Sequence, residues 1–130
     1  MKLLLFIGAL LAALPAHALL PFLFTPQAKE IRVVGAGYTV ALDNGSLISV
    51  DRFGMGYRAT MAGREIASYT QQGADWVETP GGRTWTLGTD GKWRASGGDW
   101  LLARVISDIV LRQGGSATAW KQEERAWIRK

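Results

Sequence analysis

Residues 84–95 read Thr-Trp-Thr-Leu-Gly-Thr-Asp-Gly-Lys-Trp-Arg-Ala, with apolar and polar side chains alternating on both sides of an Asp-Gly turn. This pattern predicts a β-hairpin. A three-residue loop that ends in Gly91 at positive φ places all the apolar side chains on one face, whereas a two-residue loop would mix the faces. The predicted pairs are Leu87 with Trp93 and Trp85 with Ala95.

A second hairpin is predicted around Asn44-Gly45, where a three-residue loop again leaves one apolar face. Its predicted pairs are Tyr38 with Val50 and Val40 with Ile48. Further short apolar or alternating runs indicate strands. They cover residues 31–34, 38–42, 57–61, 64–69 and 76–78. Together they predict about seven short strands in an antiparallel meander, curled into a small barrel or half-barrel.

Residues 31–37, Ile-Arg-Val-Val-Gly-Ala-Gly, are similar to the opening of a dinucleotide-binding fold. The third glycine of that fingerprint would fall at position 40, which is Val40, and no helical pattern follows. We therefore interpret the two glycines as a bend or bulge and expect no nucleotide site.

After residue 99 the apolar period changes from 2 to 3.6. Asp99 is a suitable N-cap and Gly114-Gly115 a suitable end for a helix over residues 100–113. The apolar stripe of this predicted helix consists of Leu102, Val105, Ile106 and Ile109. The predicted fold class is therefore α+β, with the curled sheet covered by one amphipathic helix.

Residues 116–130 are predicted to form a basic helical tail outside the domain of residues 19–115. Trp120 and Trp127 lie seven positions apart on one helical stripe, but Glu123 and Glu124 interrupt it. Because a buried helix would not carry two carboxylates there, we expect a tail at the surface.

The first 18 residues have the pattern of a cleaved signal peptide. Lys2 precedes an apolar run over residues 3–14, and Ala16-His17-Ala18 is a small-x-small cleavage site. The run is shorter than the ~20 residues of a membrane-spanning helix. We expect cleavage after Ala18 and export to the periplasm or the exterior. The alternative is an uncleaved membrane anchor, because residues 19–24 prolong the apolar run; residues 19–26 are otherwise expected to pack across the domain.

The chain has no cysteine, and its one histidine is His17 in the predicted signal peptide. Ser-His-Asp triads, Cys-His pairs, the usual zinc sites and His or Cys haem ligation are therefore excluded after cleavage. A carboxylate-based hydrolase, with acids such as Glu65, Asp75 and Glu78, is the one enzyme class left. Their spacing does not place two of them together, so we expect no enzyme, no catalytic residue, no cofactor and no metal site.

The expected function is that of an exported, non-enzymatic binding or accessory protein that contacts another protein. Residues 19–90 hold six basic and seven acidic residues, and residues 91–130 hold eight basic and four acidic ones, so an anionic partner would meet the C-terminal part. The predicted contact patch is Trp120, Trp127, Arg125 and Arg129.

The alternative function is a module that binds a small ligand, lipid or glycan in a pocket inside the curled sheet. The residues predicted to line it are Tyr38, Tyr57, Tyr69 and Trp76. A cell-envelope protein is the expected partner, with a glycan or an anionic lipid as alternatives; nucleic acid is not an expected partner.

Overall fold

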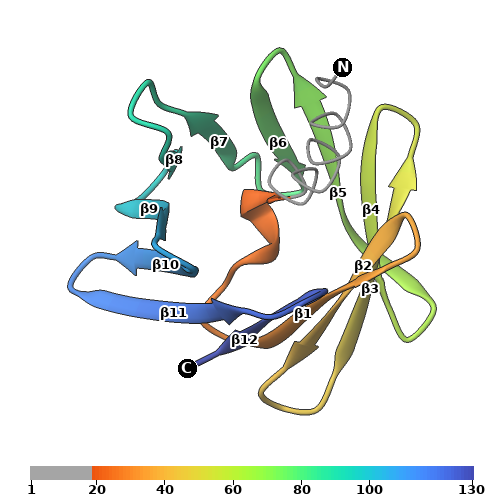
Figure 1. The fold of residues 1–130 in the computed structure, drawn as a ribbon. Coiled ribbons are helices and arrows are strands. Elements are labelled where there is room, and N and C mark those ends of the chain that lie inside the picture. Colours follow the sequence, from red (N-terminus) through yellow and green to blue (C-terminus); the bar gives the residue numbers. More distant parts are fainter. Residues whose placement is uncertain (1–18) are drawn as a thin grey trace, which may run out of the picture.

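The computed structural model describes residues 19–130, which form twelve strands and one short 3-10 turn. Each strand pairs antiparallel with the next one along the chain, and the last pairs with the first, so the sheet is a closed barrel (Figure 1). The elements are η1 (Pro21–Leu23), β1 (Ala28–Val34), β2 (Gly37–Leu42), β3 (Leu47–Phe53), β4 (Gly56–Met61), β5 (Arg64–Gln72), β6 (Asp75–Thr79), β7 (Thr84–Leu87), β8 (Trp93–Ala95), β9 (Trp100–Val105), β10 (Asp108–Gln113), β11 (Ser116–Gln122) and β12 (Ala126–Arg129). The signal peptide and the membrane anchor predicted for residues 1–18 lie outside the described residues.

The predicted α+β class is wrong, because the described chain is a barrel of twelve strands and not a sheet of about seven strands covered by a helix. Local predictions were more accurate. Both hairpin registers are confirmed, and the glycine that closes each loop has the expected positive φ, 81° at Gly91 and 90° at Gly45. The observed pairs are Leu87 with Trp93, Trp85 with Ala95, Tyr38 with Val50 and Val40 with Ile48.

The helix predicted over residues 100–113 is instead the hairpin of β9 and β10. Leu102 and Ile109 are fully buried, but Val105 and Ile106 of the same predicted stripe are 51% and 93% exposed. The sequence of this segment also fits a period of 2, and its β-branched residues suit strands. Tertiary pairing decides between the two, because β9 and β10 supply partners to β8 and β11, whose backbone groups would otherwise form open sheet edges.

The helical tail predicted over residues 116–130 is likewise a hairpin, of β11 and β12, and it closes the barrel against β10 and β1. Glu123 and Glu124, which interrupted the helical stripe, lie in the exposed turn of this hairpin. Trp120 and Trp127 lie on the strands and are buried in the core. Residues 116–130 are therefore an integral part of the barrel wall.

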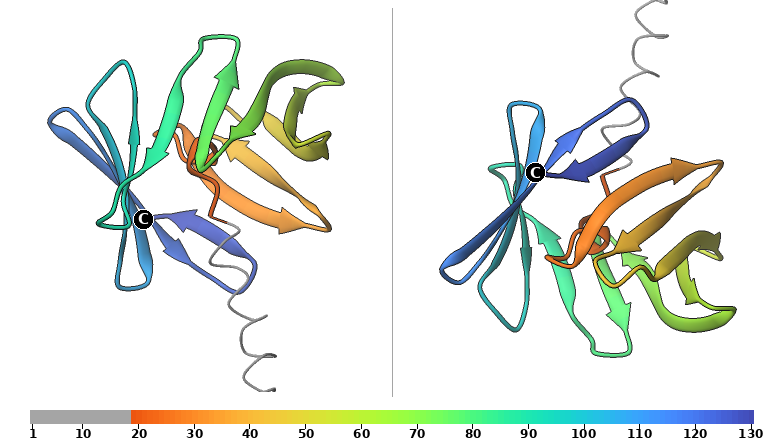
Figure 2. Two further views of the ribbon diagram at one scale, coloured as in Figure 1. Left: turned by 90° about the horizontal axis from the view of Figure 1, so that it is seen from above. Right: turned by 90° about the horizontal axis from the view of Figure 1, so that it is seen from below.

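The N-terminal segment, residues 19–27, runs through the inside of the barrel, where residues 20–24 are buried, and ends at the exposed Gln27 (Figure 2). We call it the plug. Phe24 is fully buried and meets the Trp120 and Trp127 rings edge-on, with centroids 5.1 and 5.6 Å away. Leu20 and Leu23 are buried beside it. The prediction that this apolar segment packs across the domain is confirmed, and the plug supplies the apolar volume that fills so wide a ring of short strands.

Because consecutive strands are antiparallel, the turns fall at two opposite ends of the barrel. One end, which we call the mouth, carries the turns at 43–46, 62–63, 80–83, 96–99 and 114–115, together with the start of β1 and the end of β12. Residues 19–130 contain no helix with the length and apolar composition needed to cross a bilayer.

Candidate functional site

The four aromatic residues predicted to line a pocket do come together inside the barrel. Three of them contact a ring from the plug: Phe22 stacks on Tyr69 at 3.8 Å between centroids and lies 5.3 Å from Trp76 and 6.1 Å from Tyr57. Tyr38 meets Tyr57 edge-on at 6.1 Å. Burial raises the pKa of Tyr38 and of Tyr69 to about 12. The space expected to receive a ligand is therefore filled by the chain's own phenyl ring.

The four residues of the predicted contact patch do not share a surface. Trp120 and Trp127 are 0% and 3% exposed. Arg125 lies in the exposed β11–β12 turn, whereas the Arg129 guanidinium donates hydrogen bonds to the Asp43 carboxylate and, at 2.8 Å, to the carbonyl oxygen of Pro26. Arg129 thus fastens the plug and the β2–β3 turn to the end of β12.

The three carboxylates considered for catalysis are dispersed. Glu65 is exposed on β5, and Asp75 and Glu78 lie three positions apart on β6, which puts them on opposite faces of that strand. Within residues 19–130 no group of three acidic side chains comes close enough to hold a metal ion.

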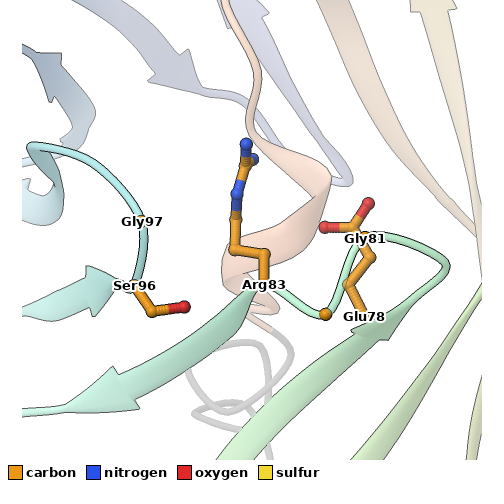
Figure 3. A pocket seen from close by; sticks show the side chains of 6 residues that line it. Glu78, Gly81, Arg83, Ser96 and Gly97 are labelled. Atoms are coloured by element: carbon orange, nitrogen blue, oxygen red, sulfur yellow. The ribbon is translucent and has the colours of Figure 1, made fainter.

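A polar cavity of about 230 Å³ opens between the β6–β7 and β8–β9 turns at the mouth (Figure 3). We call it the mouth pocket. Its lining combines a carboxylate, a guanidinium, a hydroxyl and glycine backbone that no side chain covers. The lining residues are Glu78, Gly81, Gly82, Arg83, Ser96 and Gly97.

The β6–β7 turn places the Glu78 carboxylate and the Arg83 guanidinium of this pocket near each other. The N–H of Glu78 donates to the carbonyl oxygen of Arg83 at 2.8 Å, and the N–H of Gly82 donates to the carbonyl oxygen of Glu78 at 2.9 Å. Gly81 and Gly82 adopt φ of 102° and 67°, which side-chain-bearing residues rarely do. This tight turn makes the two side chains neighbours at the rim.

Glu78 and Arg83 are nevertheless not joined in an ion pair within the described structure. The Arg83 guanidinium lies instead over the Trp100 ring, 4.3 Å from its centroid, in a cation–π contact. Burial raises the pKa of the Glu78 carboxyl, and the positive charge of Arg83 opposes part of that shift. The pocket thus presents a separate anion and cation.

Ser96 adds a hydroxyl on the opposite side of the cavity (Figure 3). Its Oγ accepts a 3.0 Å hydrogen bond from the N–H of Thr84, which fixes its position. The hydroxyl proton has no acceptor among the hydrogen bonds of the described residues and remains available to a ligand.

A second hollow, of about 270 Å³, lies on the outer face of the barrel over β8, β9 and β10. We call it the outer groove. Strand pairing puts Leu101 opposite Arg112 and Ala103 opposite Val110 on this face, away from the buried Leu102. Its floor is therefore apolar. The lining residues are Lys92, Leu101, Ala103, Arg104, Val105, Val110 and Arg112.

All the charged side chains that line the outer groove are cationic. Arg104 donates a 2.7 Å hydrogen bond to Gln122 Oε1, and the neighbouring Arg94 pairs with Asp90 at 2.9 Å. Lys92 and Arg112 form no ion pair with any described residue. Two positive charges at an apolar hollow are thus left without a protein counter-ion.

The tip of the β9–β10 hairpin continues the apolar floor. Val105 lines the groove, and Ile106 beyond it is 93% exposed. Ile106 also adopts a φ of 60°, a conformation that is unfavourable for a β-branched side chain. Glycine would suit this first position of a two-residue turn better.

The sequence prediction missed both the outer groove and the mouth pocket. The groove's signal was present as Leu101, Ala103 and Val105 at alternate positions, but the helical interpretation of residues 100–113 concealed it. The pocket joins turns that lie on different hairpins, and no local pattern connects Glu78 with Ser96.

No protein-family model, no curated protein and no solved structure matches this chain.

Proposed function

We propose that this protein is a non-enzymatic binding protein that captures an acidic segment of a protein partner in the outer groove. The observation that carries the proposal is an apolar floor flanked by Lys92 and Arg112, two cations without counter-ions. The proposal replaces the patch expected around Trp120 and Trp127, whose burial leaves them no surface to offer a partner.

The spacing of these groups fits an extended chain. Lys92 precedes β8 at the level of Val110, and Arg112 lies two residues away along β10, with β9 between them, so their backbones are roughly 12 Å apart. In an extended peptide, side chains on one face repeat every ~6.6 Å. Carboxylates two positions before and two positions after an apolar residue share its face and lie ~13 Å apart, so they can approach the two cations while the apolar side chain rests on Leu101 and Val110.

The exposed tip of the β9–β10 hairpin also indicates that a partner binds on the side of the outer groove. Ile106 combines a positive φ, which lowers the stability of the free protein, with an apolar side chain that folding leaves in water. A partner that covers the tip together with the groove would remove this side chain from water, which favours binding. Export, which we expect from the sequence of residues 1–18, would place this partner in the cell envelope.

The affinity for a short acidic segment should be modest. An exposed ion pair contributes about 0.2–1 kcal/mol, and apolar surface contributes about 25 cal/mol per Å² removed from water. Removal of both cations should therefore weaken binding by about tenfold, the equivalent of about 1.4 kcal/mol.

The test is fluorescence anisotropy with the labelled peptide acetyl-Glu-Ser-Leu-Ser-Glu-amide, whose two carboxylates and leucine share one face when the peptide is extended, at low ionic strength. We expect saturable binding that weakens with added salt. The double variant Lys92→Gln/Arg112→Gln should lose about tenfold in affinity. Arg64→Gln, which removes an exposed arginine on β5, is the matched control and should bind like the unaltered protein.

Ile106→Gly separates binding from stability. We expect its melting temperature to be equal to or higher than that of the unaltered protein, and its affinity for the peptide to be lower. Absence of peptide binding by the unaltered protein, or an equal loss in Arg64→Gln, would overturn the proposal. So would binding to phosphatidylglycerol vesicles without binding to the peptide, because that result would identify a lipid surface as the partner.

A further inference from the structure

We infer that the mouth pocket is a second, independent binding site, for a small zwitterion that carries an ammonium group and a carboxylate a few ångström apart, as a free amino acid does. This inference goes beyond the proposed function, since the pocket lies between the β6–β7 and β8–β9 turns and shares no lining residue with the outer groove.

The charges of the pocket are arranged for such a ligand. The Glu78 carboxylate is half-buried and has no ion pair within the described structure, and the Arg83 guanidinium is held over Trp100. A half-buried carboxylate without a counter-charge is unfavourable, and a ligand with an ammonium group for Glu78 and a carboxylate for Arg83 gives each of them its counter-charge. A neutral sugar or an anion alone would leave Glu78 uncompensated.

The hydrogen-bond donors of the pocket also match a zwitterionic ligand. Arg83 can donate two hydrogen bonds to a carboxylate, and the free hydroxyl proton of Ser96 can donate a third from across the cavity. The ammonium group would then donate to the Glu78 carboxylate.

The volume of the pocket sets an upper limit on the size of the ligand. A volume of about 230 Å³ is below the range of about 300–1,000 Å³ typical of pockets for drug-sized molecules. The glycines in the two turns leave no side chain between the ligand and the backbone. The ligand class is thus a small amino acid or a compound of similar charge and size.

The test uses the intact protein and three commercially available compounds that differ in which of the two charges they carry. L-alanine carries both charges, N-acetyl-L-alanine lacks the cation, and L-alaninamide lacks the anion. The readout is the two-dimensional amide NMR spectrum, in which the signals of Gly81, Gly82 and Gly97 report directly on the pocket.

We expect L-alanine to shift these three glycine signals saturably and each analogue to bind at least about tenfold more weakly. Equal shifts by all three compounds, or no shift by L-alanine at about 10 mM, would overturn the inference. Because these comparisons use the unaltered protein, they do not depend on any variant folding.

Variants provide a second line of test. Glu78→Gln and Arg83→Gln should each abolish the preference for L-alanine over one analogue, Glu78→Gln over N-acetyl-L-alanine and Arg83→Gln over L-alaninamide. Glu65→Gln and Arg64→Gln, which change exposed residues of the same types on β5, are the matched controls and should keep both preferences. Loss of a preference in a control, or its retention in both pocket variants, would assign the binding to another place on the protein.

Discussion

The indole Nε1–H of Trp120 donates a 2.7 Å hydrogen bond to the carbonyl oxygen of Ala28, although the two residues are 92 positions apart in the sequence. Trp120 is fully buried, and its ring also meets Phe24 of the plug edge-on. The Trp120 side chain of β11 therefore contacts both the start of β1, which belongs to the barrel wall, and the plug, which fills the barrel.

Replacing Trp120 by phenylalanine should lower the free energy of unfolding by about 2–4 kcal/mol, because the change removes ring volume and leaves the Ala28 carbonyl without this donor. Trp85→Phe is the matched control. Trp85 is 2% exposed, and its Nε1–H has no hydrogen-bond partner in the structure, so that variant loses volume alone. Urea unfolding measures both, and equal losses would show that the hydrogen bond to Ala28 contributes nothing.

Deleting residues 116–130 should abolish folding. A detachable helical tail would have allowed this deletion, but β11 and β12 occupy the space between β10 and β1 and bury two tryptophans. Their removal opens two sheet edges and exposes the core. Far-UV circular dichroism and NMR dispersion of the truncated chain provide the measurement. A cooperative thermal transition like that of the full chain would contradict the closed barrel.

Phe22→Ala tests whether the plug is part of the core. Removal of a buried phenyl ring costs about 3–5 kcal/mol, which is a large share of the ~5–15 kcal/mol stability of a typical domain. Phe53→Ala is the control, because Phe53 is 54% exposed and contacts Arg58 at the surface, 4.5 Å from ring centroid to guanidinium carbon. We expect the control to lose less than about 1 kcal/mol. Similar losses for the two variants would mean that the plug is not packed as the structure has it.

The ion pair between Asp43 and Arg129 should make stability depend on pH in the acid range. The hydrogen bond from Arg129 holds the pKa of the Asp43 carboxyl below its ordinary value. A lowered pKa in the folded state means that the stabilisation is present above the unfolded pKa of about 3.9 and is lost as pH falls through the folded value.

Asp43→Asn should accordingly be less stable than the unaltered protein near neutral pH, and the difference should shrink as pH falls below about 4. Thermal unfolding at a series of pH values measures it. A difference in melting temperature that stays constant down to the lowest pH would indicate that the carboxylate charge is not the cause.

The aromatic residues inside the barrel and the outer groove show how much of a site can be predicted from sequence patterns. Tyr38, Tyr57, Tyr69 and Trp76 are predicted from the sequence to line one pocket, and their rings do lie together inside the barrel, since each is on the inward face of its strand. Phe22 comes from outside the sheet, and no periodicity could show that its ring would pack against three of them. The outer groove depended on assigning residues 100–113 to strands, where helical and strand periods both fitted the apolar residues.

The sequence by itself determined the local pairing of the chain. The loops that end in Gly45 and Gly91 set the register of their hairpins, because positive φ at one position and a one-faced apolar pattern are properties of a few adjacent residues. It also excluded chemistry that needs a cysteine, because the chain has none. Only the tertiary structure decided that residues 100–130 are strands and that β12 meets β1. Those outcomes depend on edge pairing and burial between segments about 90 residues apart, where both helix and strand satisfy the local pattern and the core selects the one that closes the barrel.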